Sequence, residues 1–164
     1  MIDLLKLATL LEQMRCRPAV LSGQWDGQNF DIVAGSNKNA VLVKALKTFD
    51  DRSAREIETI YSDLCAKSSG WLLGKRFELV ILAETVDVDI QPYFDWSERL
   101  RKIASRSRLY DMKSGGGRVS VVDLENKEIL PRTKWFPEDG SNIGRELQKL
   151  HLDTSWGRAL VECW

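Results

Sequence analysis

Apolar and polar positions along the chain predict alternating helices and strands. Leucines and other apolar residues recur at helical spacing over residues 2–15, and again over residues 54–67 after the candidate N-caps Asp50, Asp51 and Ser53. The nearly continuous apolar run 77–83 is typical of a central strand that is covered on both faces. Shorter apolar runs predict further strands over 17–22, 30–34 and 40–45.

Two turns are predicted in the first half of the chain. Residues 23–29 are expected to form the first, and the Gly- and Asn-containing segment 35–39 is expected to form the second, as the turn of a β-hairpin. The register of that hairpin is open. A four-residue loop, 36–39, would pair Asp31 with Lys44, whereas a five-residue loop, 35–39, would pair Asp31 with Val43.

The second half of the chain has weaker signals. We expect a helix over 96–109, a flexible turn at Gly115–Gly117, a late hairpin over 119–124 and 128–130, and a helix over 143–150. The whole is predicted to be one α/β domain, with a mixed central sheet of four to six strands flanked by helices. Residues 1–130 would form its core, and residues 131–164 a C-terminal extension that packs on the core.

Composition narrows the function classes. The 164 residues carry a formal net charge of zero, so any attraction to nucleic acid or to acidic membranes must be local. No apolar run approaches the roughly 20 residues that a membrane span needs. The N-terminus is not typical of a signal peptide, and the three cysteines (Cys16, Cys65 and Cys163) lack metal-ligand spacing, so a cytoplasmic protein with reduced thiols is expected.

Two charged residues interrupt the apolar strands of the predicted hairpin. Asp31 stands near the start of the first strand and Lys44 near the end of the second. A charge that is buried in a sheet needs a partner, water or a chemical role, because its desolvation is costly. Asp31 and Lys44 are therefore the first candidates for a functional site.

The expected order of helix, three strands, helix and strand resembles the core of the restriction-endonuclease-like superfamily, the PD-(D/E)xK nucleases, which includes archaeal Holliday-junction resolvases. The resemblance covers residues 1–83. It implies that Asp31 and Glu12 bind a divalent metal, Mg or Mn, and that Lys44 assists the attacking water. In Val41-Leu42-Val43-Lys44 the family's acid position is Leu42, which cannot ligate a metal, and in this respect the chain is similar to nuclease-like domains of archaeal regulators.

A carboxylate from another element could replace the missing acid. Glu12, Asp26, Glu56 and Glu58 are candidates, with Glu12 the best placed by analogy with the family. The hypothesis is that Glu12, Asp31 and Lys44 converge in the folded protein.

Phosphate contacts would come from basic residues. Residues 84–98 are acidic and residues 99–118 are basic, so the basic segment either lies along a nucleic acid or pairs with the acidic run. The candidates for nucleic-acid binding are Lys44, Lys47, Arg99, Arg101, Lys102 and Arg106.

Three functions remain open at this point. The first is a nucleic-acid-associated protein on a nuclease-like fold with a degenerate catalytic motif, with DNA favoured over RNA. The second is an active, divalent-metal-dependent endonuclease. The third is a non-enzymatic interaction or assembly subunit, whose protein partner binds the tryptophan-rich C-terminus (Trp135, Trp156 and Trp164).

Overall fold

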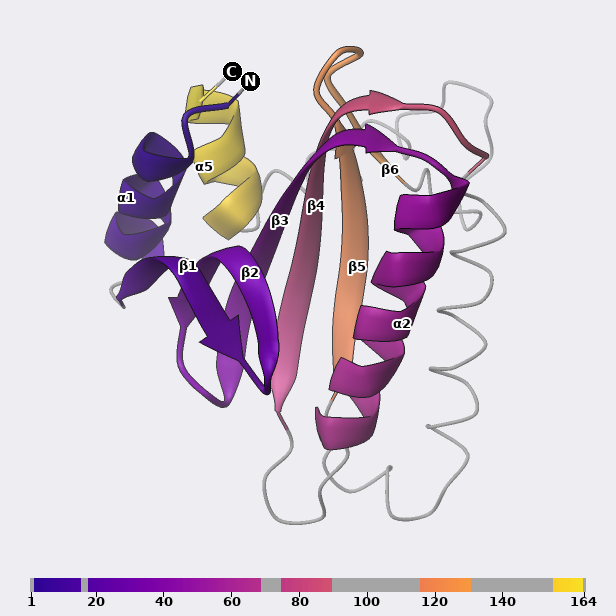
Figure 1. Ribbon diagram of the computed structural model, residues 1–164. Coiled ribbons are helices and arrows are strands. Elements are labelled where there is room, and N and C mark those ends of the chain that lie inside the picture. The colour runs from indigo at the N-terminus through magenta and orange to yellow at the C-terminus, as the bar shows by residue number, and fades with distance from the viewer. Residues whose placement is uncertain (1, 16–17, 69–74, 90–115, 131–154, 164) are drawn as a thin grey trace, which may run out of the picture.

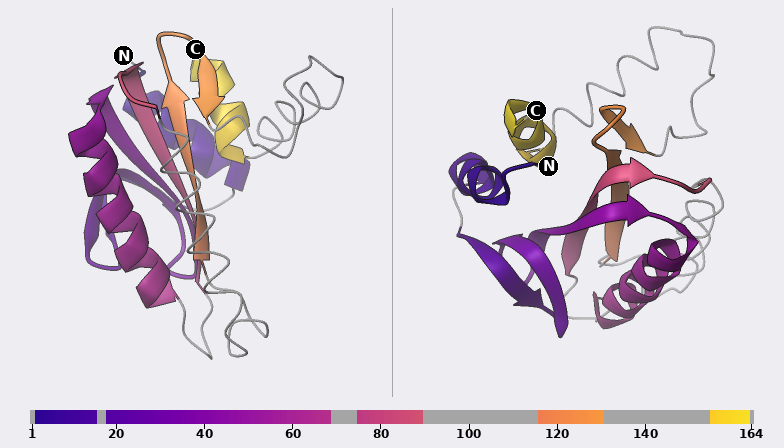
Figure 2. Two further views of the ribbon diagram at one scale, coloured as in Figure 1. Left: turned by 90° about the vertical axis from the view of Figure 1, so that its right-hand side faces the viewer. Right: turned by 45° about the horizontal axis from the view of Figure 1, so that its top comes forward.

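A computed structural model describes residues 2–15, 18–68, 75–89, 116–130 and 155–163. Three layers are visible, with a sheet between α2 on one face and α1 and α5 on the other (Figures 1 and 2). The elements are α1 (Leu4–Arg15), β1 (Ala19–Trp25), β2 (Gln28–Gly35), β3 (Asn39–Phe49), α2 (Asp51–Ser68), β4 (Arg76–Val86), β5 (Gly116–Asp123), β6 (Glu128–Leu130) and α5 (Ser155–Cys163).

The six strands lie in the sheet in the order of the sequence, β1-β2-β3-β4-β5-β6. The pairs β1–β2, β2–β3 and β5–β6 are antiparallel, whereas β3, β4 and β5 run parallel. The prediction of an α/β fold with a mixed sheet flanked by helices is confirmed, and so is the central position of β4, which is buried on both faces.

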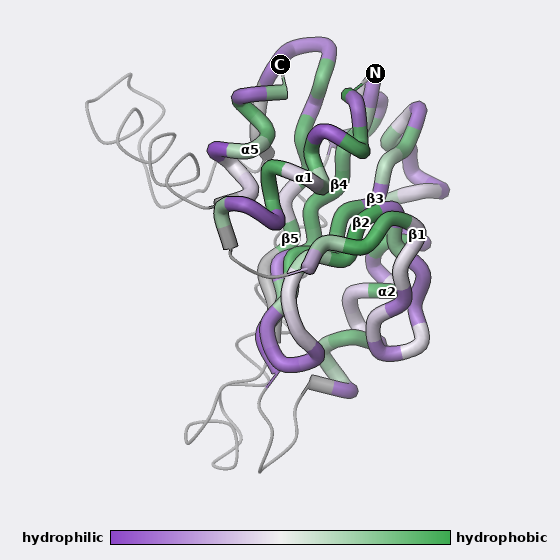
Figure 3. The backbone as a smooth tube through the Cα atoms, turned by 90° about the vertical axis from the view of Figure 1, so that its left-hand side faces the viewer, coloured by the Kyte–Doolittle hydropathy of each residue, from purple (hydrophilic) through white to green (hydrophobic). Residues whose placement is uncertain are grey.

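The sheet separates two apolar clusters. One lies under α2, where Ile57, Tyr61 and Leu64 pack against Leu42 and Leu79. The other lies under α1 and α5, and includes Leu7, Leu11, Trp156 and Leu160 together with alternate residues of β2, β3 and β4. Figure 3 shows the hydrophobic character of the strands that lie between the two helical layers. Their near-continuous apolar sequences follow from this burial on both sides.

Helix α2 begins with a capping box. The Asp50 carboxylate accepts a hydrogen bond from the Ser53 backbone N–H, and the Ser53 hydroxyl accepts one from the Asp50 N–H, both at 2.8 Å. The bonds from Ser53 hold the pKa of Asp50 below its ordinary value, because they stabilise the charged carboxylate. Asp50 is therefore the N-cap among the three predicted candidates.

Two predicted turns are corrected by the structure. Residues 23–29 are mostly strand, because Asp26 and Gly27 alone turn the chain, with φ angles of 47° and 82° that suit a tight hairpin turn. Gly116 and Gly117 lie in β5, where they pair with Arg76 and Phe77 of β4. The helices expected over 96–109 and 143–150 lie outside the described residues.

Helix α5, near the C-terminus, packs against the N-terminal helix α1 (Figure 1). The Lys6 ammonium donates a hydrogen bond to the carbonyl of Glu162 at 2.8 Å. The Trp156 indole is 3% exposed and its N–H bonds to the Glu78 carboxylate of β4. None of the described helices combines the length and the apolar character that crossing a bilayer requires.

Candidate functional site

Strands β2 and β3 form a fork. Their ladder runs from the Gly35–Ala40 pair to the Ile32–Val43 pair and then stops, although β3 continues beside β4 as far as Phe49. The next positions on the two strands are Asp31 and Lys44. The structure therefore confirms the register with the four-residue loop, which places these two candidates opposite each other where the strands separate.

Asp31 closes this fork through its side chain. Its Oδ2 accepts a hydrogen bond from the Ala45 backbone N–H at 2.8 Å, so a carboxylate satisfies a β3 donor beyond the last β2–β3 pair. On the β1 side of β2, Asp31 stands opposite Ser22. Ser22 has a left-handed φ of 50°, and the β1–β2 ladder has no Ser22–Asp31 pair.

The β1–β2 hairpin bends at this point and curls over the sheet (Figure 1). Gly23 follows the bend, and a Cβ atom there would lie 2.9 Å from Cγ2 of Val33. The bend also redirects the side chains of β2. Ile32 belongs to the core under α1, whereas Phe30 belongs to the core under α2. Asp31 is therefore located at the bend of the β1–β2 hairpin, opposite Ser22.

Lys44 lies on the α2 side of the sheet, in phase with Leu42. Its Nζ is 3.4 Å from Oε1 of Glu56 on α2, and the two side chains are 22% and 58% exposed. A pair this exposed contributes little to stability, about 0–1 kcal/mol. Leu42 itself is fully buried under α2, so the position that the resemblance to PD-(D/E)xK nucleases would assign to an acid is part of the apolar core.

Glu12 has a different partner. Its Oε2 accepts a hydrogen bond from the Ala19 backbone N–H at 3.0 Å, which ties α1 to the start of the edge strand β1. The acid that the structure brings to Lys44 is Glu56, one of the four candidates considered above. Glu12, Asp31 and Lys44 thus contact three different segments, and their convergence stays a prediction.

The divalent metal implied by the resemblance finds no matching ligand set in the described part of the chain. No group of three or more His, Cys, Asp or Glu side chains there is placed to hold a metal ion. One oxygen of Asp31 is occupied by the Ala45 N–H, and Leu42, the position that the resemblance would assign to an acid, is buried. The fork therefore offers a carboxylate and an ammonium group, without the second strand carboxylate that the resemblance would require.

The predicted phosphate-binding residues are only partly described. Lys47 is exposed on β3, and Lys44 is mostly covered and paired with Glu56. Arg99, Arg101, Lys102 and Arg106 lie outside the described residues.

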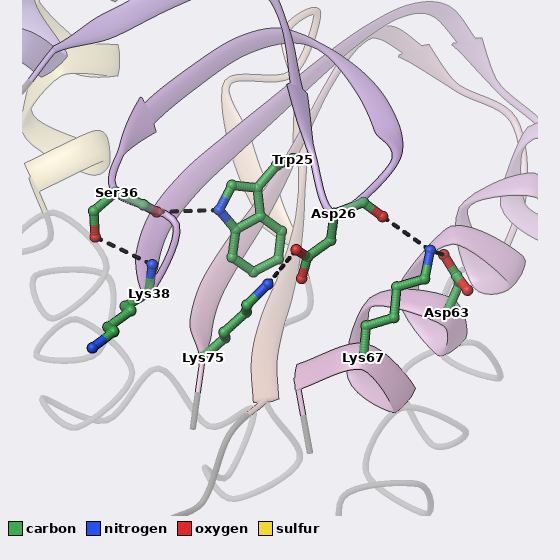
Figure 4. A network of polar contacts seen from close by, with 7 residues as sticks. All are labelled: Trp25, Asp26, Ser36, Lys38, Asp63, Lys67 and Lys75. Carbon is green, nitrogen blue, oxygen red and sulfur yellow. Dashed lines mark hydrogen bonds and ion pairs between the residues drawn. The ribbon is translucent and has the colours of Figure 1, made fainter. Parts of the chain in front are cut away.

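A second polar cluster surrounds the tip of the curled hairpin, and sequence reasoning missed it (Figure 4). The Trp25 indole N–H bonds to the Ser36 carbonyl at 3.1 Å, and the Lys75 ammonium lies 5.4 Å from the centroid of the Trp25 ring. Lys75 also forms an ion pair with Asp26, in which the lysine side chain is 24% exposed and the aspartate 15% exposed.

Helix α2 contributes the other half of this cluster. The Lys67 ammonium donates hydrogen bonds to the Asp26 carbonyl at 3.0 Å and to the Asp63 carboxylate at 2.9 Å. Asp63 also accepts from the Gln28 amide at 2.9 Å. The bonds from Lys67 and Gln28 lower the pKa of Asp63, because both favour the charged carboxylate. The Asp26-Gly27 dipeptide was the sequence signal that could have revealed this tight turn.

We compared the chain with protein-family models, curated proteins and solved structures. No protein-family model, no curated protein and no solved structure matches the chain.

Proposed function

We propose that this chain is a nucleic-acid-associated protein on a restriction-endonuclease-like core whose catalytic motif is degenerate. The observation that carries the proposal is the fork, where an aspartate on the second strand stands opposite a lysine on the third. The order of helix, three strands, helix and strand, with β3 and β4 parallel, supports the same assignment.

The surroundings of the fork support loss of cleavage. Leu42 fills the acid position with a side chain that is fully buried, and a carboxylate there would lose its hydration inside an apolar cluster. The neighbouring Lys44 pairs with Glu56. With neither a second strand carboxylate nor an unpaired lysine, the fork is suited to holding the hairpin in place rather than to activating water.

Binding would be electrostatic and local. The chain has a net charge of zero, so contacts with phosphates depend on where the cations are concentrated and on the salt concentration. DNA is the favoured ligand because the resemblance is to nucleases and resolvases of DNA.

An active endonuclease is the second candidate, and one observation favours it. Glu56 lies 3.4 Å from Lys44 and is 58% exposed, so an acid from α2 is available beside the lysine. Cleavage in that case would require Asp31 and Glu56 to act together.

The test is a binding and cleavage panel. Labelled single-stranded, duplex and branched DNA and RNA are incubated with manganese or EDTA, over a series of salt concentrations. The matched variants are D31N, which keeps an oxygen acceptor for the Ala45 N–H, and K44M, which keeps most of the stem of the lysine. We expect salt-dependent binding without cutting.

The other outcomes are equally informative. Manganese-dependent cutting that D31N abolishes would establish the endonuclease. If the protein neither binds nor cuts, the interaction or assembly subunit becomes the remaining function. Trp156 is buried against β4, so its side chain is not available to such a partner in this conformation.

A further inference from the structure

A basic rim surrounds the start of the parallel strands, at the end of the sheet where β3 and β4 begin. We define it by Lys38, Lys67, Lys75 and Arg76, which come from the β2–β3 turn, the end of α2 and the start of β4. The Arg76 backbone N–H bonds to the Lys38 carbonyl at 2.8 Å, so these two residues are immediate neighbours. The Asp26 turn joins the other two, because Lys75 pairs with its carboxylate and Lys67 with its carbonyl.

The charges of the rim do not cancel. Asp26 at the hairpin tip is paired with Lys75, and Asp63 in the C-terminal half of α2 is paired with Lys67. Lys38 and Arg76 are exposed, and no described acid forms an ion pair with either of them. Figure 4 shows the Lys38 ammonium directed away from the cluster. In a chain with zero net charge, this is a local concentration of positive charge.

The rim is also built rigidly. The polar contacts of Trp25, Asp26 and Ser36 hold the hairpin tip against β4 and α2. Lys38 sits in the turn that Ser36 closes, since the Ser36 hydroxyl accepts from the Lys38 and Asn39 N–H groups at 3.3 Å and 3.2 Å. Cations on a fixed backbone lose less conformational freedom when they bind a polyanion.

We propose that the basic rim, with Lys38 and Arg76 as its two available cations, contacts the phosphate backbone of the bound nucleic acid. This inference rests on the proposed function and assigns its binding surface away from the fork. Lys44 stands five residues beyond Asn39 on β3, which corresponds to about 16 Å along the strand. The phosphates that Lys38 and Arg76 contact would therefore lie far from Asp31.

The experiment measures binding of a labelled DNA duplex from low to high salt for the wild type and for K38Q/R76Q. Both substitutions remove charge from exposed side chains whose described hydrogen bonds are made by the backbone. We expect roughly tenfold weaker binding at low salt, and a log–log salt slope that is smaller by about 1.8, for the loss of two phosphate contacts.

The matched control is R52Q/R55Q, which removes the same charge from exposed positions of α2 beside Asp51 and Glu56. It should bind as the wild type does, and circular dichroism should show equal melting of all three proteins. Equal binding by K38Q/R76Q and the wild type, or equal loss in the control, would overturn the rim while leaving the proposed function standing. A wild type that binds no nucleic acid would overturn both.

Discussion

The Asp31 carboxylate accepts a hydrogen bond from the backbone N–H of Ala45 at 2.8 Å, beyond the point where the β2–β3 ladder ends. This bond links the bend of the β1–β2 hairpin to β3. The residue that resembles a catalytic aspartate thus has a structural role that any functional experiment must separate from a chemical one.

The first prediction follows from this bond. D31A leaves the Ala45 N–H without its acceptor and should lower the free energy of unfolding by about 1–3 kcal/mol. D31N keeps an oxygen acceptor and should lose clearly less. Urea unfolding of both variants makes the comparison, and a D31A protein as stable as the wild type would contradict the structural role.

A second prediction concerns the bend beside Asp31. A Cβ added at Gly23 meets Val33 Cγ2 at 2.9 Å, and the β-branched side chain of Val33 has little freedom to move away. G23A should therefore destabilise the protein by about 1–3 kcal/mol, the usual cost of overpacking.

The control for this contact is a double-mutant cycle. V33A removes the methyl group that the new Cβ would touch, so G23A should cost less in a V33A background than in the wild type. Equal costs in the two backgrounds would show that contact with the Val33 methyl group is not what requires glycine at position 23.

The third prediction tests the ion pair at the hairpin tip. Asp26 is 15% exposed, and its Oδ2 is buried without a described hydrogen-bond partner, so the carboxylate depends on Lys75 for compensation. K75M should be strongly destabilising, toward the roughly 3 kcal/mol that removal of one partner from a buried pair costs. Chemical denaturation monitored by tryptophan fluorescence measures the change.

The neutral double variant D26N/K75M separates the charge from the packing. Asparagine adopts the left-handed conformation of position 26 and leaves no uncompensated charge, so much of the lost stability should return. A double variant no more stable than K75M would place the effect in the packing of Lys75 on Trp25.

The fourth prediction concerns pH. The bonds from Ser53 lower the pKa of Asp50 from its ordinary value of 3.8, so the folded state binds this proton less readily than the unfolded state. The stability from this group is present above about pH 4, and is lost as the pH falls through the lowered value in the folded state.

Asp63 should contribute in the same direction, because Lys67 and Gln28 lower its pKa. Unfolding midpoints measured from pH 6 to pH 2 should fall in the acid range, and by less in a D50N/D63N variant. The same acid-dependent decrease in that variant would assign the effect to other carboxylates.

Much of the fold could be predicted from the chain alone. The spacing of apolar residues indicated α1, α2 and the central strand β4. The face of an element that is buried determines which positions in its own sequence are apolar. Asp31 and Lys44 stood out for the related reason that a charge in an apolar strand is costly. Their common register was one of two alternatives that the loop length allowed.

Tertiary structure decided the rest. The partner of Lys44 is Glu56 and the partner of Glu12 is the Ala19 N–H, and both follow from how the helices lie on the sheet. The rim joins Lys38 to Arg76 and Lys67 to Lys75, residues that are distant in sequence or on separate elements. Local periodicity reports which face of an element is buried, but contacts between elements depend on the curl of the hairpin at Ser22 and on the crossover between β3 and β4, which no single segment encodes.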